Sequence, residues 1–435
     1  MHTCLKKEGL SSRLKKRRLV VFFLIVILQP LTSLISQAQN LEEYLQMAGE
    51  NNPELKAYFN DYLAELERIP QLGALPDPEL SMGIFLKPME RFMGNQQADI
   101  QLMQMFPWFG ILGARKDEAA KIAQTRYEAF QDAKNRLFYQ VKETWYQLYQ
   151  LKEEIRFTEE NLKTLQTYER VALVKYQSGG GSGKTDADMS DVLRVRIEIK
   201  TVENNLAFLK SSRLPLQAEF NQLLNRNLDE PVELADTLEI VELSNERLSV
   251  LDSITQNNPM LKMLDAEKEA YGFQKKTARL EGRPMFGAGV NYMAFSPRTE
   301  AGMPMGGMDM VMPMVSVTIP IYRKKYKALS REAELKQEAV GQRREYLVSQ
   351  LTTQWAASIR DLDDARRKAE LYREQTDMVG QTLRLLMTSY SASGQGFEEI
   401  LRVQQQLFDY QLALVTAVVD QHTTMAMLEM LAGGK

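Results

Sequence analysis

Two hydrophobic periodicities alternate along this chain of 435 residues. In short segments, apolar side chains occupy every second position, as from Leu80 to Leu86, which is typical of a strand with one apolar face. In long segments, apolar residues recur every seven positions with a second set interleaved, as from Val141 to Leu165, which is typical of coiled-coil helices. The pattern predicts a mainly α protein with a small β part, in which long antiparallel coiled-coil hairpins accompany a few strands.

Four strands are expected, two in each half of the chain. Their predicted bounds are about 78–87, 98–107, 284–293 and 311–320. In the last strand Val315 and Val317 alternate with Ser316, so one face is apolar and the other is small or polar. A half-buried sheet of a soluble protein shows the same alternation. If the sheet instead lies in a membrane, several chains must combine their strands, because four strands cannot close a barrel and a membrane accepts no open edge.

Each pair of strands is followed by a long helix, a turn near glycines and a returning helix. A helix from about Arg115 to Tyr176 would be on the order of 90 Å long, more than a globular domain requires. The predicted organisation is a signal peptide at 1–38, a first repeat at 39–246 with a hairpin at about 113–226 and a linker at 227–246, and a second repeat at 247–435 with a hairpin at about 322–432.

The two halves contain similar short motifs in the same order. Asn51-Asn52-Pro53 recurs as Asn257-Asn258-Pro259, and Asp191-Val192-Leu193-Arg194 recurs as Glu399-Ile400-Leu401-Arg402. Proline suits the first turn of a helix and disfavours helix in the residue before it, so each Asn-Asn-Pro marks the end of one helix and the start of another. These similarities predict an internal duplication.

The N-terminal residues are typical of a secretory signal peptide. Seven basic residues precede the apolar run from Leu19 to Leu28, and small residues follow around Ala38, the expected cleavage position. Without residues 1–38 the chain carries 47 basic and 56 acidic residues, which makes nucleic acid an unexpected partner.

The sequence offers little material for catalysis, and neither an enzymatic activity nor a cofactor is expected. The only cysteine is Cys4, inside the predicted signal peptide, and the only other histidine besides His2 is His422. The segment from Gly179 to Thr185 resembles a phosphate-binding loop, but it follows a predicted helix instead of a strand, so we interpret it as a turn.

Methionine is concentrated near the second pair of strands. The cluster consists of Met303, Met305, Met308, Met310, Met312 and Met314, supplemented by Met89, Met93, Met103 and Met105 from the first pair. Thioethers are soft ligands that suit Cu(I) or Ag(I), so the cluster is a candidate metal-contacting site. Methionine also fills irregular loops and barrel surfaces without any metal. Both interpretations stay open.

With these motifs in their order and spacing, the chain from about Leu41 onward resembles the TolC-like outer-membrane efflux family. The residues that carry the resemblance include the Asn-Asn-Pro repeats and the strand-to-helix junctions Phe106-Pro107-Trp108 and Ile319-Pro320-Ile321. The resemblance implies a homotrimer with a twelve-stranded barrel in the outer membrane and a helical tunnel in the periplasm. It also implies contact with outer-membrane lipid and partnership with an inner-membrane pump and a periplasmic adaptor.

The resemblance further implies a gate at the helical turns, where the family uses tyrosine, acidic and arginine side chains. The matching residues here are Tyr390, Asp191 and Glu399, with glutamate in place of aspartate, and Arg194 and Arg402 are further candidate gate residues beside them. Arg402 departs from the family, which has a second acid there, so rewired contacts are expected. Asp191 and Arg194, like Glu399 and Arg402, are three residues apart, a spacing that also suits a purely local contact on a helix.

The predicted function is an outer-membrane duct of a tripartite system that exports small molecules or metal ions, with Cu(I) or Ag(I) as candidate cargo. A duct for type I protein secretion is an alternative with the same architecture. A periplasmic adaptor or structural coiled coil would explain the hairpins but not the strands and the duplication. A soluble periplasmic enzyme would need a cofactor motif or polar cluster that the sequence lacks.

Overall fold

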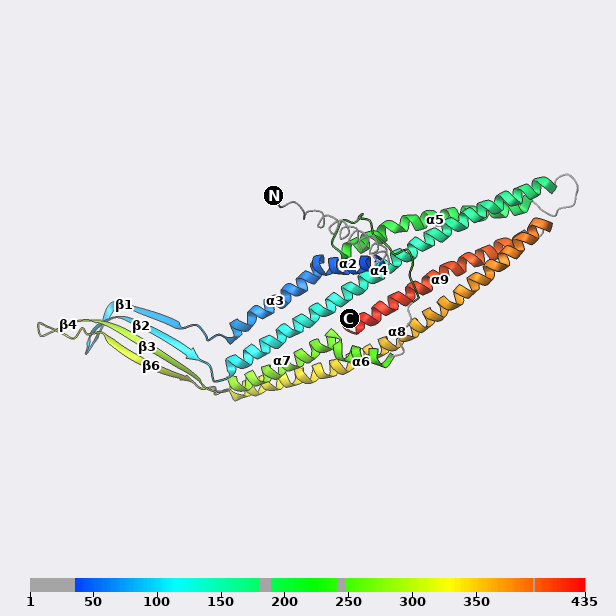
Figure 1. The fold of residues 1–435 in the computed structure, drawn as a ribbon. Helices are drawn as coiled ribbons and strands as arrows, with labels where there is room; N and C mark the ends of the chain where they lie inside the picture. The colour runs from blue at the N-terminus through cyan, green and yellow to red at the C-terminus, as the bar shows by residue number, and fades with distance from the viewer. Residues whose placement is uncertain (1–35, 180–188, 241–246, 394–395, 435) are drawn as a thin grey trace, which may run out of the picture. The chain divides into compact units, whose positions relative to one another are not determined.

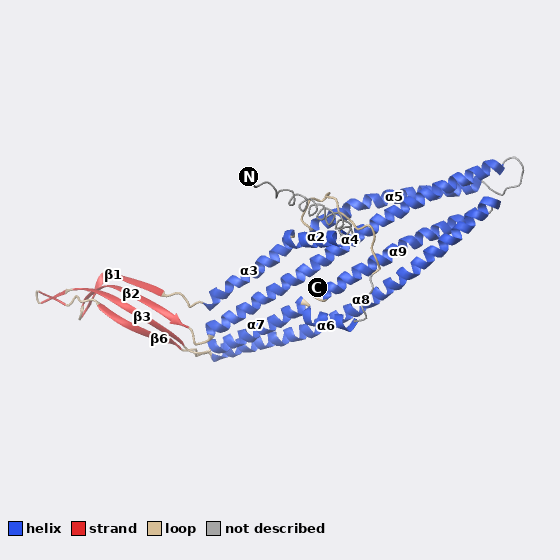
Figure 2. Cartoon of the chain, viewed as in Figure 1, coloured by secondary structure: helices blue, strands red, loops and turns tan. Residues whose placement is uncertain are grey.

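The computed structural model describes residues 36–179, 189–240, 247–393 and 396–434, and it is mainly helical with a small antiparallel sheet (Figure 2). The predicted signal peptide lies almost wholly outside the described residues, as does most of the glycine-rich turn. The chain divides into two compact units, and each unit takes segments from both halves of the sequence. Unit 1 comprises residues 1–52, 136–245 and 357–430, and unit 2 comprises residues 53–135, 246–356 and 431–435.

Unit 2 contains a four-stranded antiparallel sheet (Figure 1). Its strands are β1 (Glu79–Arg91), β2 (Gly94–Phe106), β3 (Met285–Ser296) and β6 (Met310–Thr318), in the order β1-β2-β3-β6. All four predicted strands are present, although the first three are longer than expected. Within the described residues, β1 and β6 each pair on one side only, so the sheet has two open edges.

A short hairpin of β4 (Arg298–Glu300) and β5 (Met303–Met305) lies between β3 and β6 and was not predicted. Its turn contains Ala301 and Gly302, both with positive φ, and Gly306 and Gly307 follow with the same left-handed backbone. The close approach of other backbone explains the glycines, because a Cβ on Gly306 would lie 2.4 Å from the Met93 carbonyl oxygen.

The sheet register confirms the predicted division between two faces. Ser316 pairs with Gly287, which in turn pairs with Met105, whereas Val315 pairs with Ala288. Because successive side chains of a strand point to opposite faces, Ser316 and Met105 share one face while Val315 and Val317 lie on the other.

Five helical segments accompany the sheet in the described part of unit 2. They are α3 (Pro53–Gly73), α6 (Arg247–Asn257), α7 (Pro259–Glu281) and the first parts of α4 (Ile111–Gly179) and α8 (Arg323–Ser393). Aromatic rings join α3 to α4, since Phe59 lies 5.4 Å from Phe130. Ion pairs join α4 to α7 through Arg115 and Glu281 at 2.7 Å, and α7 to α8 through Asp265 and Arg344 at 2.7 Å.

The second asparagine of each Asn-Asn-Pro motif binds the end of a returning helix, and Asn258 is also a helix cap. The side-chain oxygen of Asn258 accepts hydrogen bonds from the backbone N–H groups of Met260 and Leu261 at the start of α7, at 3.1 and 3.3 Å. Its amide group donates to the carbonyl oxygen of Leu431 at 3.0 Å. In unit 1, the amide of Asn52 likewise donates to the carbonyl oxygen of Leu223, the last residue of α5, at 3.0 Å.

Unit 1 consists of helices and one extended segment. The helices are α2 (Ser36–Asn51), α5 (Met189–Leu223), α9 (Phe397–Leu431, except its last residue) and the later parts of α4 and α8. The extended segment after α5, which was predicted as a linker, lies along α4. The Trp145 indole N–H donates to the Glu233 carbonyl at 3.1 Å, and the Leu238 N–H donates to the Tyr149 hydroxyl at 3.1 Å.

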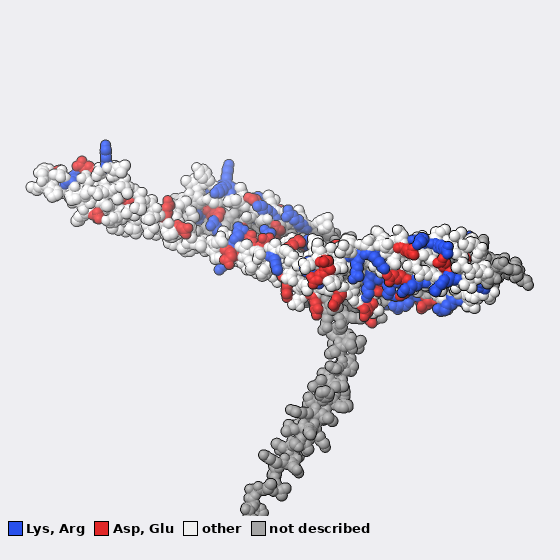
Figure 3. All heavy atoms as spheres, turned by 90° about the horizontal axis from the view of Figure 1, so that it is seen from above, with Lys and Arg blue, Asp and Glu red and all other residues white. Residues whose placement is uncertain are grey.

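Charged side chains are distributed unevenly over these elements. In the face shown by Figure 3, lysine, arginine, aspartate and glutamate are intermixed over the helices, whereas the strands, at the left, show few charges. Among the described helices, none combines the length and the apolar character needed to cross a membrane.

Candidate functional site

Two thioethers and a hydroxyl meet on the polar face of the sheet. The Ser316 hydroxyl lies 3.8 Å from the sulfur of Met103 and 3.7 Å from the sulfur of Met105, both on β2. The intervening strand β3 carries Gly287 and Gly289 at this point. A Cβ on Gly287 would lie 2.2 Å from the Ser316 oxygen and 2.7 Å from the Met105 sulfur, so only glycine leaves room for these contacts.

The predicted methionine cluster divides between two places. Met310, Met312 and Met314 lie on β6 and alternate with Val311, Pro313 and Val315, so they share the polar face with Ser316. Met303 and Met305 belong to β5 instead, and they are exposed, as is Met308. The six methionines are therefore divided between β5, the loop that follows it and β6. Among the described residues, no group of three His, Cys, Asp or Glu side chains could hold a metal ion.

The opposite face of the sheet exposes large apolar side chains. Ile84 on β1 and Val315 on β6 are 73% and 81% exposed, although both are fully apolar. Leu80, Met82, Leu102, Val311 and Val317 are also exposed. Contiguous apolar surface of this kind marks a region that contacts another chain or a membrane.

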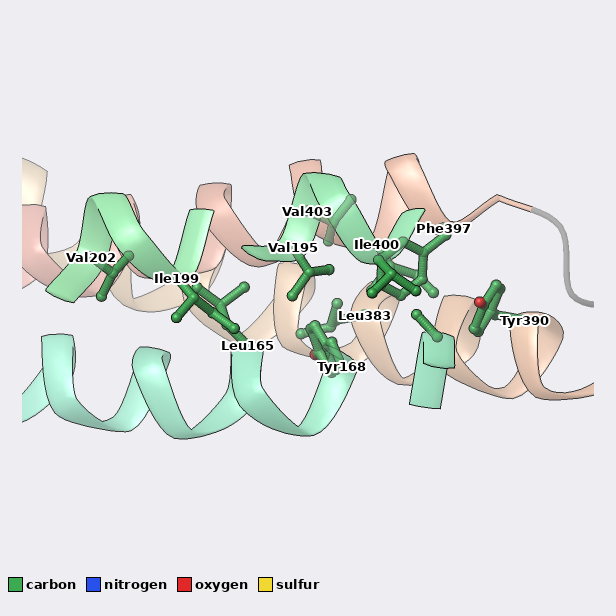
Figure 4. Close-up of a cluster of buried hydrophobic side chains, with 12 residues drawn as sticks. Leu165, Tyr168, Val195, Ile199, Val202, Leu383, Tyr390, Phe397, Ile400 and Val403 are labelled. Carbon is green, nitrogen blue, oxygen red and sulfur yellow. The ribbon is translucent and has the colours of Figure 1, made fainter. Parts of the chain in front are cut away.

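The ends of the helical hairpins in unit 1 enclose a separate apolar cluster (Figure 4). It combines residues of α4, α5, α8 and α9, including Leu165, Val195, Tyr390 and Ile400. The ring of Tyr390 is fully buried and lies 5.0 Å from the ring of Phe397. The hairpin ends are therefore packed together within one chain.

Tyr390, one of the expected gate residues, lies inside this cluster. Its hydroxyl has no hydrogen-bond partner among the described residues, despite being buried. Burial raises the pKa of this hydroxyl, and the negative charge of Asp191 raises it further. Tyr390 and Asp191 are thus close enough to interact electrostatically, and Tyr390 faces the interior of the cluster.

Two ion pairs lie on the surface beside this cluster. Arg194 of α5 binds Glu398 of α9 at 2.7 Å, so it connects two hairpins. Arg402 binds Glu399 on the same helix, with its Nε atom 3.0 Å from Oε2, and this contact lowers the pKa of Glu399. The predicted Glu399–Arg402 contact is confirmed, whereas the pairing of Arg194 with Glu398 was not predicted.

A buried polar network between α4 and α9 was also not predicted. The amide of Gln404 donates to the Asn161 side-chain oxygen at 2.8 Å, and the Tyr168 hydroxyl donates to the Gln404 side-chain oxygen at 3.2 Å. Such a network specifies one alignment of two helices, because a shift would leave buried polar atoms unpaired. The sequence signal was a glutamine directly after Val403, inside an otherwise apolar seam.

Long helical hairpins and an open-edged antiparallel sheet make up a fold that is also found in solved structures of outer-membrane channels. The chain is similar to the transmembrane channel CusC, with a TM-score of 0.74, 15% identity and coverage of 91% of this chain and 92% of that one. It is similar to the outer-membrane channel OprN, with a TM-score of 0.75, 12% identity and coverage of 91% and 90%. It is also similar to the outer membrane protein VceC from Vibrio cholerae, with a TM-score of 0.73, 13% identity and coverage of 91% and 96%.

These likenesses confirm the prediction of a mainly helical fold with a small antiparallel sheet over most of the chain, while the trimer and the internal duplication stay predictions. CusC, OprN and VceC have nearly equal TM-scores against it, so the fold does not single out the CusC-like branch. No protein-family model and no curated protein matches the sequence.

Proposed function

We propose that this protein is a TolC-like duct subunit of the bacterial outer membrane that serves a tripartite efflux system. The observation that carries the proposal is the four-stranded sheet, which combines an exposed apolar face with two open edges. Water disfavours the exposed apolar face of such a sheet, and lipid disfavours the unpaired backbone N–H and C=O groups at its open edges. Three copies would supply twelve strands and close the edges.

The fold of the similar structures supports this assignment. OprN is described as an outer-membrane channel and VceC as an outer membrane protein, and both are covered almost completely by this chain. In the proposed assembly, the sheet lies in the outer membrane and the helical hairpins of an internally duplicated chain form a periplasmic tunnel. An inner-membrane pump and a periplasmic adaptor deliver the cargo.

Ion conduction tests the proposal. The protein is purified from the outer-membrane fraction and added to planar bilayers of phosphatidylethanolamine and phosphatidylglycerol, with the detergent buffer alone as control. We expect discrete single-channel steps of uniform size. Recovery only from the soluble periplasmic fraction, or insertion without conductance steps, would contradict the duct and favour an adaptor.

The gate is proposed at the hairpin ends, where Arg194 joins α5 to α9 and Tyr390 joins the cluster. Each surface ion pair is worth only about 0.2–1 kcal/mol, so closure would be the sum of several small contacts across three chains. Tyr390→Phe, Glu399→Ala and Arg402→Ala together should raise conductance without loss of assembly. A matched control is Arg366→Ala with Glu370→Ala, an ion pair elsewhere on α8. Parental conductance in the triple variant would place the constriction elsewhere.

Cu(I) or Ag(I) is proposed as a candidate cargo, supported by the thioethers beside Ser316 and by those of β6 on the same face. Replacing Met303, Met305, Met308, Met310, Met312 and Met314 with leucine keeps the bulk and removes the sulfur. Cells should then lose copper or silver tolerance while the protein stays in the membrane. Unchanged copper and silver tolerance in an otherwise sensitive strain would indicate that these methionines have a purely structural role.

A further inference from the structure

Two pockets adjoin in unit 2, where the sheet meets the helices. The first has a volume of about 500 Å³ and includes Met285, Ile319, Ile321 and Tyr322 in its lining. The second has a volume of about 490 Å³ and lies between the end of α7 and the start of α8. Arg283 and Tyr326 line both pockets, so the two pockets adjoin at these side chains.

The second pocket is strongly basic. Its lining contains six basic side chains and one acidic side chain, Glu334; the basic ones are Lys275, Arg279, Arg283, Arg323, Lys327 and Arg331. Glu334 binds both Lys275 and Arg331 at 2.8 Å, and these hydrogen bonds lower its pKa to about 2. Glu334 therefore stays ionised and forms ion pairs with two of the six basic side chains.

The other four cations have no acidic partner. Arg279, Arg283, Arg323 and Lys327 form no ion pair within the part of the chain that the structure describes. Arginine binds phosphate through two parallel hydrogen bonds, which makes a group of unpaired arginines a suitable phosphate site. Mutual repulsion among these four cations would also be relieved by a bound anion.

The surface beside this basic pocket is apolar and exposed. Ile319, Ile321 and Tyr322 are 68%, 77% and 83% exposed, and they directly precede Arg323 in the chain. They follow β6 directly in the chain, and Val315 and Val317 on the apolar face of β6 are also exposed. A ligand that satisfies both surfaces needs an anionic group next to hydrocarbon, and aromatic and basic side chains in this order are typical of a membrane boundary.

We propose that these two pockets bind an anionic phospholipid, with its phosphate against Arg283, Arg323 and Lys327. The acyl chains lie against Ile319, Ile321 and Tyr322. The proposal rests on the outer-membrane location proposed above, because that location supplies the lipid. A soluble phosphate compound would use the same cations but would leave the three apolar side chains exposed to water.

Native mass spectrometry of the full-length protein, released from detergent micelles, tests the proposal with dioleoylphosphatidylglycerol and dioleoylphosphatidylcholine as probes. The parent should retain phosphatidylglycerol at least ten-fold more strongly. Arg283→Gln, Arg323→Gln and Lys327→Gln together should abolish this preference. The matched control, Arg366→Gln with Arg367→Gln and Lys368→Gln, makes the same charge change elsewhere on α8 and should keep it. If the parent retained the two lipids equally, the proposal would be overturned. It would also be overturned if the control variant lost the preference for phosphatidylglycerol together with the site variant.

Competition identifies the source of the phosphate. Inorganic phosphate should displace phosphatidylglycerol poorly, and Ile321→Ser with Tyr322→Ser should weaken lipid retention several-fold. Complete displacement by inorganic phosphate would overturn the lipid in favour of a soluble anion. The same spectra separate this inference from the proposed function: trimers that retain no lipid contradict the inference alone, whereas a monomeric protein contradicts the proposed function.

Discussion

Large apolar side chains are buried at the hairpin ends of unit 1 but exposed on the sheet of unit 2. At the hairpin ends, Tyr390 and Ile400 are completely buried within a single chain. In the sheet, Ile84 and Val315 are mostly exposed, and β1 and β6 lack a neighbour on one side among the described residues. The difference teaches that the helical cluster is packed within one chain, while the sheet leaves an apolar face and two edges uncovered, which the proposed assembly would cover.

The largest expected effect is at the hairpin ends. Ile400→Ala should lower the free energy of unfolding of unit 1 by about 2–5 kcal/mol, because it leaves a cavity among well-packed side chains. Leu385→Ala, at an exposed position on α8, is the matched control and should change it little. The chain has three tryptophans, and only Trp145 lies in unit 1. In a background with Trp108→Phe and Trp355→Phe, the fluorescence of Trp145 therefore reports the unfolding of unit 1 in urea. Equal effects of the two variants would contradict the packed cluster.

The next effect tests the exposed face of the sheet. Val315→Arg should cost about 2–4 kcal/mol per chain, because it places a charge in lipid. Met312→Arg lies on the same strand but on the opposite face, and it should be tolerated better. The measurement is the amount of assembled, heat-modifiable protein in the outer-membrane fraction. Similar losses for both variants would mean that the apolar face does not contact lipid.

A smaller effect is expected at the asparagine cap of unit 2. Asn258→Ala removes the acceptor for two N–H groups of α7 and should cost about 1–2 kcal/mol. Asn257→Ala is the adjacent control, since its side-chain amide donates only to the Ser253 hydroxyl at 3.2 Å. The midpoint of urea unfolding, followed by circular dichroism, compares the two. A larger loss for Asn257→Ala would show that the cap is not what stabilises this junction.

The smallest effect is a pH dependence in unit 1. Burial lowers the pKa of His422 below its usual 6.5, against the opposing hydrogen bond to the Glu239 carbonyl. The unfolded chain therefore takes up a proton before the folded chain does, and stability is lost as the pH falls below 6.5. His422→Gln should reduce the loss of stability between about pH 7.5 and about pH 5.5. An unchanged pH profile of Trp145 unfolding would contradict this assignment.

The faces of the strands and the long helices could be predicted from the periodicity of the sequence. The alternation around Ser316 correctly predicted which residues share a face, because a strand has a strict period of two. The long helices followed from their seven-residue spacing. The β4–β5 hairpin was missed because its strands have three residues each, too few for any periodicity to appear.

The missed features depend on contacts that are distant in sequence. Nothing near Asn258 indicates that its amide binds the carbonyl of Leu431, 173 residues away. The methionine cluster was predicted from its density along the chain, which carries no information that Met303 and Met305 lie on β5, paired with β4, while Met310, Met312 and Met314 lie on β6. Tyr390 was assigned by family position, which carries no information on the packing that buries it.

The central claim, that three chains close one sheet, is tested most directly by cross-linking the open edges. Cys4 is the only cysteine and lies in the predicted signal peptide, so the mature chain gives no background. One set of variants combines Ser81→Cys on β1 with cysteine at Met312, Met314 or Thr318 on β6, and oxidation is carried out in native outer membranes. For the pair that matches the register between chains, we predict a ladder that ends at the trimer on a non-reducing gel. A ladder that ends at the dimer or extends beyond the trimer would contradict the account.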